Sequence, residues 1–175
     1  MDNTVTSPTT KGIVLGLILA ILGFISFFMQ MDRYNPFQYI SYFIFLGGII
    51  WSVWYYGKQI AHQGTFGNYF AHGFKTAATI TAIMILFFLI LMLAFPEFKV
   101  DAIEASKKEM ASQKGITEEQ INQAVDLSGK FFGVFLIGGT MLGYLFFGAV
   151  AALIGAGITK KDPTRIAADI SQINQ

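Results

Sequence analysis

The two histidines, His62 and His72, are the side chains best suited to metal or proton chemistry in this sequence. They lie around Gly64 and Gly67 in a connecting segment, residues 58–75. A zinc site needs a third ligand at least, and this segment has no Asp, Glu or Cys to supply one. Cysteine is absent from the whole chain, which excludes disulfides and thiolate chemistry. The sequence therefore predicts no metal site, while a role in proton sensing stays open.

Hydroxyl side chains inside apolar stretches are the next candidates for chemistry. A nucleophile needs a base beside it, and we expect no Asp, Glu or His at depth in those stretches. Such hydroxyls usually bond to helix carbonyls or across helices. They belong to Ser26, Ser41, Ser52, Thr79 and Thr140. Gly64-x-x-Gly67 lacks the further glycine of a dinucleotide loop, and no phosphate-binding Gly-Lys-Ser/Thr loop occurs. We therefore expect no enzyme, no catalytic residues and no cofactor.

Four long apolar stretches must position these residues. The predicted spans are 12–31, 37–57, 70–95 and 131–158, each long enough as a helix to cross a hydrocarbon layer of about 30 Å. Composition agrees with a membrane protein, with 54% hydrophobic and 13% charged residues. The net charge of +1 gives no reason to expect a nucleic-acid partner. The bilayer itself is the first expected partner.

The predicted fold is all-α, an integral membrane four-helix bundle in one domain, 1–175. Between spans three and four, residues 97–130 are predicted to form an extramembrane helical hairpin, and 159–175 a C-terminal tail. Pro96 is expected to break the exit of span three, and Thr117 with Gln120 has the spacing of a capping box. From there a helix is expected to run on toward span four. Asn68 is a candidate cap for the helix that enters span three.

The lysines and arginines near the span ends favour one orientation. One side holds Lys11, Lys58, Lys75, Lys160, Lys161 and Arg165, and the other Arg33, Lys99, Lys107, Lys108, Lys114 and Lys130. Lys107, Lys108 and Lys114 stand far out in the long loop, where positive charge counts little. Without those three lysines, the side that holds both termini has more basic residues near the span ends than the other side. This excess predicts that both termini lie in the cytoplasm.

Residues 65–74 read Thr-Phe-Gly-Asn-Tyr-Phe-Ala-His-Gly-Phe. This stretch resembles the Ser/Thr-aromatic-Gly-x-x-Phe-x-x-Gly-Phe segment of the domain of unknown function 4199 family, small four-span proteins found chiefly in Bacteroidota. The layout is similar over most of the chain, although Ala71 stands where many members have a basic residue. The resemblance implies a bacterial inner-membrane protein and assigns no activity. The candidate interaction motif comprises Thr65, Phe66, Gly67, Phe70, Gly73 and Phe74.

Small residues four apart indicate where helices approach closely in lipid. The candidate packing glycines are Gly12, Gly16, Gly139, Gly143 and Gly155. Packing within one chain and homodimerisation through span four both fit this pattern.

Two functions from different classes remain. The leading hypothesis is a non-enzymatic accessory or interaction protein, acting through a membrane protein partner or through lipid. The alternative is a small transporter or channel subunit that acts as a homo-oligomer. Small exporters of this size use an intramembrane carboxylate, whereas the nearest acids here, Asp32 and Glu97, stand at span ends.

Overall fold

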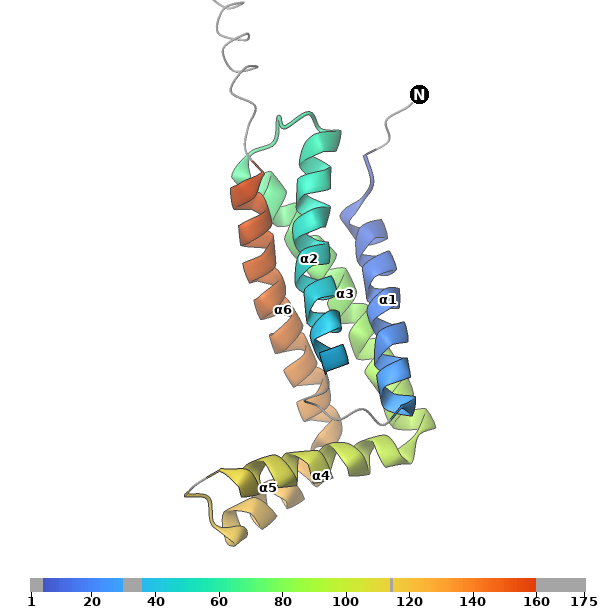
Figure 1. Ribbon diagram of the computed structural model, residues 1–175, viewed down its shortest axis with the longest axis vertical. Helices are drawn as coiled ribbons and strands as arrows, with labels where there is room; N and C mark the ends of the chain where they lie inside the picture. The colour runs from blue at the N-terminus through green and yellow to red at the C-terminus, as the bar shows by residue number, and fades with distance from the viewer. Residues whose placement is uncertain (1–4, 30–35, 114, 160–175) are drawn as a thin grey trace, which may run out of the picture. The chain divides into compact units, whose positions relative to one another are not determined.

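The computed structural model describes residues 5–29, 36–113 and 115–159. These residues are mainly helical and include no strand. The helices are α1 (Pro8–Phe28), α2 (Pro36–Gln59), α3 (Phe66–Ala94), α4 (Pro96–Ser112), α5 (Glu118–Lys130) and α6 (Phe132–Ile158) (Figure 1). Among them α1, α2, α3 and α6 are long and apolar enough to cross a membrane. The predicted all-α, four-span fold is confirmed.

The chain divides into two compact units, which are described separately. Unit 1 holds the described residues up to Ile83 and those from Tyr144 onward. It therefore contains α1, α2, the first part of α3 and the last part of α6. Unit 2 is Met84–Gly143, which contains α4, α5, the end of α3 and the start of α6.

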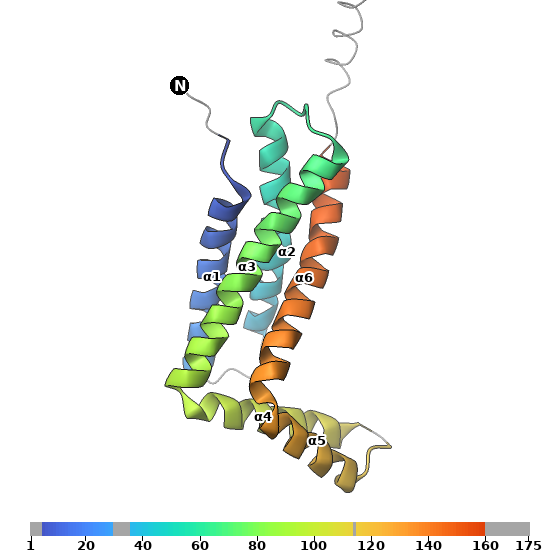
Figure 2. The same cartoon turned by 180° about the vertical axis from the view of Figure 1, so that it is seen from behind.

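Within unit 1, α3 first packs on α2 and α6 and then passes to α1. A Cβ atom built on Gly73 would lie 2.6 Å from Val53 Cγ2 and 2.8 Å from Ala152 Cβ, so these three helices approach closely there. Further along, a Cβ on Gly12 would lie 2.6 Å from Thr79 Cβ. Figure 2 shows this course from the opposite side of Figure 1, with α3 running diagonally in front of the other helices. Small residues thus set the helix spacing, as expected in lipid.

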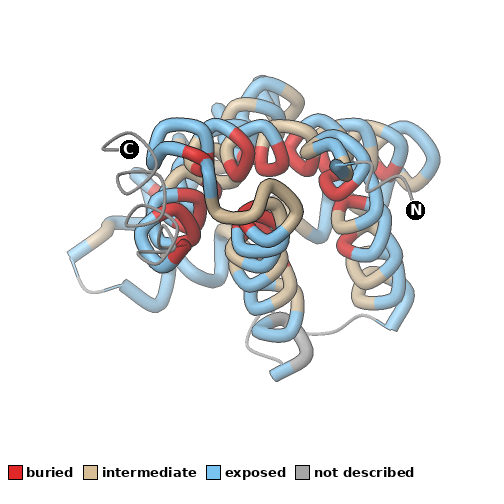
Figure 3. Tube along the Cα trace, turned by 90° about the horizontal axis from the view of Figure 1, so that it is seen from above, coloured by how far each residue is buried: buried red, intermediate tan, exposed pale blue. Residues whose placement is uncertain are grey.

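Most buried residues of unit 1 are apolar, and many residues on its outer faces are apolar as well. Figure 3 shows the buried residues on the inward faces of the helices. They include Leu19, Phe45, Ile49, Val53, Tyr69, Ala77, Ile80, Ala151, Ala152 and Ala156. Ile21 and Phe43 lie on outer faces and are 60% and 77% exposed. A soluble protein rarely exposes so much apolar surface, whereas a bilayer covers it with hydrocarbon.

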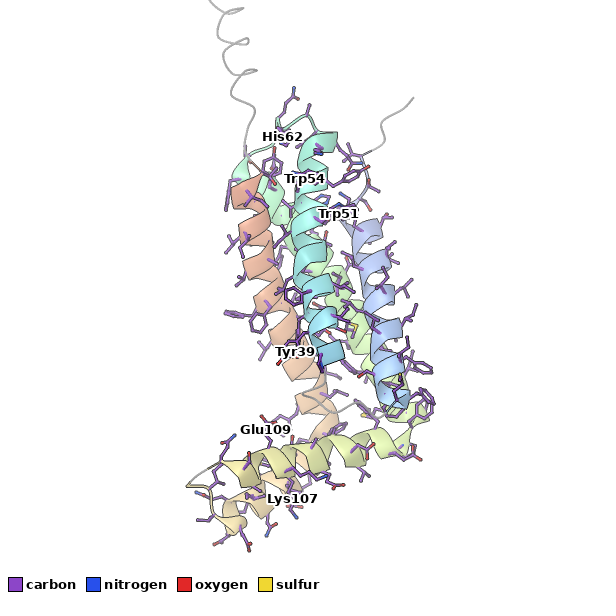
Figure 4. The ribbon with its side chains drawn as sticks, in the orientation of Figure 1. Tyr39, Trp51, Trp54, His62, Lys107 and Glu109 are labelled. Atoms are coloured by element: carbon purple, nitrogen blue, oxygen red, sulfur yellow. The ribbon has the colours of Figure 1, made fainter. Side chains whose placement is uncertain are left out.

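Aromatic residues occur toward both ends of α2. Figure 4 shows Tyr39 at one end, with Trp51 and Trp54 nearer the loop that carries His62. Trp51 stacks on Tyr55 with ring centroids 5.3 Å apart. Amphipathic rings at these depths are typical of the two membrane–water interfaces.

In unit 2, α4 and α5 pack against each other. A Cβ on Gly129, near the end of α5, would lie 3.9 Å from Ile103 Cδ1 in the middle of α4. Because the connection between α4 and α5 is short, the two packed helices are antiparallel. Gly115 has φ +94°, a left-handed conformation that glycine adopts without strain, and it turns the chain between them. Phe98 stacks on Phe88 with centroids 6.2 Å apart and meets the Phe132 ring edge-on at 6.1 Å.

Two predicted helix boundaries in unit 2 are confirmed. α3 ends at Ala94 and α4 starts at Pro96, with Phe95 extended between them. The capping box is also present, since Thr117 Oγ1 accepts from Gln120 N at 3.3 Å and Gln120 Oε1 accepts from Thr117 N at 3.0 Å. The helix does not continue unbroken into span four, because Phe131 leaves helical geometry between α5 and α6.

The predicted Asn68 cap is wrong. α3 begins at Phe66, and Thr65 caps it: Thr65 Oγ1 accepts from Asn68 N at 3.3 Å, and Thr65 O accepts from Tyr69 N at 3.1 Å. Residues 66–75, which sequence analysis assigned to the connecting segment 58–75, therefore belong to α3. Lys114 and the predicted tail beyond residue 159 lie outside the described residues.

Candidate functional site

The most unusual residue of unit 1 is a buried lysine. The inward face of α1 consists of Lys11, Gly12, Gly16 and Leu19. Because Gly12 has no side chain, α1 approaches the α3 backbone closely, with Thr76 O only 2.9 Å from a Cβ built on Gly12. The same approach encloses the neighbouring Lys11, which is 6% exposed. Sequence analysis had placed Lys11 outside the first span, as a flanking charge.

Lys11 connects α1 to both α2 and α3. Its Nζ donates to the backbone carbonyl of Ser52 on α2 at 3.1 Å. It also lies 3.4 Å from Nε2 of His72 on α3, at the outer limit of a hydrogen bond. The ring of Tyr55 on α2 provides a cation–π contact, 5.0 Å from Nζ to its centroid.

A chain of hydroxyls runs beside this lysine. Thr76 Oγ1 donates to the carbonyl of His72 at 3.0 Å, one turn back on α3. Since that proton is committed, Ser52 must be the donor in its 3.1 Å hydrogen bond to Thr76 Oγ1. The imidazole of His72 stacks on Tyr56, with ring centroids 4.1 Å apart and an interplanar angle of 11°. We call Lys11, Ser52, His72 and Thr76, with the Tyr55 and Tyr56 rings, the Lys11 junction.

Positive charges around the junction are not matched by negative ones among the described residues of unit 1. The described residues of unit 1 include Lys11, Lys58 and Lys75 but no Asp or Glu. Lys11 also stands in the first turn of α1, where the helix dipole disfavours a positive charge. A buried ammonium needs compensation, and here neutral acceptors and an aromatic face provide it.

Sequence reasoning missed this junction because it took the spans as free of ionisable groups and put His72 in a loop. Lys11 and His72 instead belong to helices that qualify as membrane spans, α1 and α3. A signal was present, since His72, Thr76, Thr79 and Ile83 share one face of a helix.

The members of the predicted interaction motif have different environments. Thr65 caps α3, and Gly73 lies in the close approach to α2 and α6. Phe70 packs beside the buried Val53, Tyr69 and Ala156 and stacks on Phe74 with centroids 5.8 Å apart. Phe66 is 54% exposed, and Gly67 is exposed too. Their role in an interaction stays a prediction.

The predicted packing glycines fall into two groups. Gly12, Gly16 and Gly155 lie in close helix contacts, since added Cβ atoms would meet Thr79, Ile83 and Val53 at 2.6, 2.8 and 3.0 Å. Gly139 and Gly143 face open space, with nothing within 4 Å of an added Cβ. The three closely packed glycines match packing within one chain, and what covers the other two stays a prediction.

His62 has a strained setting of its own. Ala61 and His62 have φ of 51° and 58°, in the left-handed region that most residues avoid. Its Nδ1 is buried without a hydrogen-bond partner and lies 3.4 Å from a Cβ built on Gly57. No group of three or more His, Asp or Glu side chains suited to a metal occurs in the part of the chain that the structure describes.

Unit 2 carries a second candidate site, the surface of the α4–α5 hairpin. No residue of α4 is buried, and α5 buries only Ile121. Val100 has helical spacing to Ile103, which the sequence alone would interpret as an apolar inner stripe, but it is 62% exposed, and Leu127 is 50% exposed. Figure 4 shows Lys107 and Glu109 on the outer surface of α4.

All Asp and Glu residues that the structure describes belong to this hairpin. They are Glu97, Asp101, Glu104, Glu109, Glu118, Glu119 and Asp126, and each is exposed. Glu104 pairs with Lys108 at 3.0 Å and Asp126 with Lys130 at 2.8 Å. Exposed pairs of this kind add at most about 1 kcal/mol to stability. These exposed ion pairs therefore contribute little to the stability of the hairpin.

Comparison with known proteins gives a family and no activity. The family described as protein of unknown function (DUF4199) matches residues 10–161. The chain therefore belongs to the DUF4199 family. No curated protein and no solved structure matches it.

Proposed function

We propose that this DUF4199 protein is a non-enzymatic membrane protein that binds a partner protein through the α4–α5 hairpin. The observation that carries the proposal is the distribution of charge. All the described carboxylates are exposed on the hairpin, while the described residues of unit 1 have none. In the full sequence, residues 97–130 contain seven acids and five lysines, so a partner with a basic surface is the best complement.

The Lys11 junction supports a binding role over a catalytic one. Its polar groups bond to one another across α1, α2 and α3, and the Ser52 hydroxyl donates to Thr76 rather than to a base. An activated nucleophile needs a base as its partner. The membrane helices in this proposal act as an anchor that holds the hairpin.

We also propose that the protein lies in the bacterial inner membrane with both termini in the cytoplasm. The family resemblance supports the bacterial inner membrane. The excess of basic residues near the span ends at Lys11, Lys58 and Lys75 supports cytoplasmic termini. The hairpin follows three of the four span helices, and with cytoplasmic termini this places it on the periplasmic side, where a partner would meet it.

Purification from the source membrane in native nanodiscs, followed by mass spectrometry, tests the proposal. The variant Asp101→Lys/Glu104→Lys reverses two exposed charges of α4. We expect it to retain about tenfold less of a stoichiometric partner than the natural chain, a loss of about 1.4 kcal/mol. The control Asp101→Glu/Glu104→Asp keeps both charges and should retain the partner. Recovery of the protein alone, or equal recovery with both variants, contradicts the hairpin as docking surface.

A small transporter or channel subunit that acts as a homo-oligomer is the second candidate. The observation in its favour is that Lys11 and His72 lie on helices that qualify as membrane spans. Ionisable groups inside membrane spans commonly mark transport pathways. Gly139 and Gly143 have the open surroundings that an oligomer contact needs. Flux into proteoliposomes should then fall when both glycines are replaced by Leu. Retained flux in that variant contradicts a dimer-based site.

A further inference from the structure

Lys11 and His72 form a pair in which two ionisable nitrogens from different helices lie 3.4 Å apart. An ammonium group only donates hydrogen bonds, so the contact requires an unprotonated His72 Nε2 when Lys11 is charged. If His72 is the charged partner, Lys11 must be a neutral amine that accepts. Either way the bonded pair holds one positive charge, and two coupled groups of this kind titrate as a unit.

Among the described residues of unit 1, the charged and titratable groups around the pair include none that could form an ion pair with a second positive charge. On α2 the neighbours are the Tyr55 ring below Lys11 and the Tyr56 ring stacked on His72. On α3 they are Tyr69, edge-on to Tyr56, and the cationic Lys75, one turn further along the helix from His72. The part of α6 in unit 1 has Tyr144 as its one titratable residue, and the described residues of unit 1 contain no carboxylate.

The pair lies near one end of unit 1. Lys11 stands in the first turn of α1, which directly follows the exposed cap residue Ser7. The loop with His62 and the end of α6 at Thr159 meet at this end, since a Cβ on Gly57 would contact both residues. A second polar link lies nearby, where Gln59 Nε2 donates to Thr6 Oγ1 at 2.7 Å. Protons from the solution on this side therefore have a short path to the pair.

We propose that Lys11 and His72 form a proton-binding site that holds one positive charge, and that a second proton separates the start of α1 from α2 and α3. With both nitrogens protonated, neither can accept from the other, and two like charges face each other in a buried space. Release of Lys11 toward water relieves this repulsion and opens the α1 contact. The site rests on unit 1 alone and does not depend on the proposed role of the hairpin.

Distances between spin labels measure this opening directly. The natural chain has no cysteine, so Val14→Cys and Ala71→Cys place two unique labels on exposed positions of α1 and α3. The labelled protein in phosphatidylcholine nanodiscs is measured by double electron–electron resonance from about pH 8 to about pH 4, on both sides of the usual histidine pKa of about 6.5. At about pH 8 we expect a narrow distribution of distances between the two labels. At about pH 4 we expect a broader distribution with a longer mean distance, and the narrow distribution should return when the pH is raised again.

Matched variants assign the response to the pair. His72→Gln keeps a neutral acceptor at every pH, so its distribution should stay narrow throughout. His62→Gln removes the only other histidine and should respond as the natural chain does. A label pair at Phe43 and Phe147, on exposed positions of α2 and α6, should stay unchanged and so separate local opening from unfolding.

Three outcomes would overturn the proposal. The first is an unchanged α1–α3 distance in the natural sequence over the whole pH range. The second is a response that persists in His72→Gln, or in His72→Asn should the Gln variant not fold. The third is a response that disappears in His62→Gln, which would assign it to the loop histidine.

Discussion

At the residue scale, single glycines decide what is buried in unit 1. Gly12 lets α1 reach the backbone of α3, and this contact encloses the neighbouring Lys11. The sequence shows the glycines and their spacing but not which face of each helix meets another. Gly12 and Gly139 look alike in sequence, yet the first is tightly packed and the second is open. The difference comes from tertiary packing, which residue spacing alone does not determine.

The packed and open glycines should respond differently to a methyl group. Gly73→Ala should lower the free energy of unfolding by about 1–3 kcal/mol, because its Cβ would overlap Val53 Cγ2 and Ala152 Cβ. Gly139→Ala meets nothing and should raise it by up to about 1 kcal/mol through helix propensity. Thermal unfolding in detergent, followed by circular dichroism, gives the comparison. Equal effects of the two substitutions would show that the close approach at Gly73 is absent.

The hydroxyl chain of the Lys11 junction should behave as a coupled pair. Thr76→Val leaves the buried Ser52 hydroxyl without its acceptor and should cost about 1–3 kcal/mol. Adding Ser52→Ala removes the unpaired group, so the double variant should be less destabilised than the sum of the single changes. Thr79→Val is the control, since that hydroxyl bonds only to a carbonyl of its own helix, Lys75 O at 2.9 Å. Strictly additive costs in the denaturation cycle would contradict the Ser52–Thr76 bond.

At the element scale, helix ends were predictable where their signal was local. Pro96 and the Thr117–Gln120 box are short-range patterns, and both helices start where these patterns indicate. The start of α3 was missed because Thr65 and Asn68 are both good cap residues three positions apart. The choice is made by tertiary contacts: Tyr69 is buried and its hydroxyl accepts from Gly64 N at 3.1 Å. Tyr69 and His72 both lie on the buried side of the helix that begins at Phe66.

The capping box should stabilise the start of α5. Thr117→Ala removes the acceptor for Gln120 N and should cost about 1 kcal/mol, mostly as local fraying. Hydrogen exchange followed by mass spectrometry should show faster exchange in the first turn of α5. Ser112→Ala is the control, because this exposed hydroxyl donates to a carbonyl and caps no amide. Unchanged exchange in Thr117→Ala would mean that the box does not stabilise the helix.

At the scale of the whole molecule, the spans were predictable and the buried polar contacts were not. Length and hydropathy are properties of each segment, so four membrane helices follow from sequence alone. The Lys11 junction combines residues of three helices, and no single segment contains its pattern. The same holds for the hairpin, where Val100 fits an inner stripe by spacing but is exposed.

Four crossings should place the two connecting regions on opposite sides of the membrane. In the orientation proposed here, a membrane-impermeant maleimide should label Lys107→Cys in intact cells and Gln63→Cys only after permeabilisation. The absence of natural cysteine keeps the background low. The reverse pattern would reverse the orientation, and labelling of both positions in intact cells would contradict the four-span layout.

Site-specific photocrosslinking in the native membrane tests the central claim most directly. A photoreactive residue at Lys107, on the exposed surface of α4, is compared with one at Leu153, on an exposed apolar face of α6. We expect the Lys107 probe to link one protein other than this chain, a link that Asp101→Lys/Glu104→Lys abolishes, while the Leu153 probe links lipid. No protein product at Lys107, or only products of this chain with itself, would contradict binding through the hairpin.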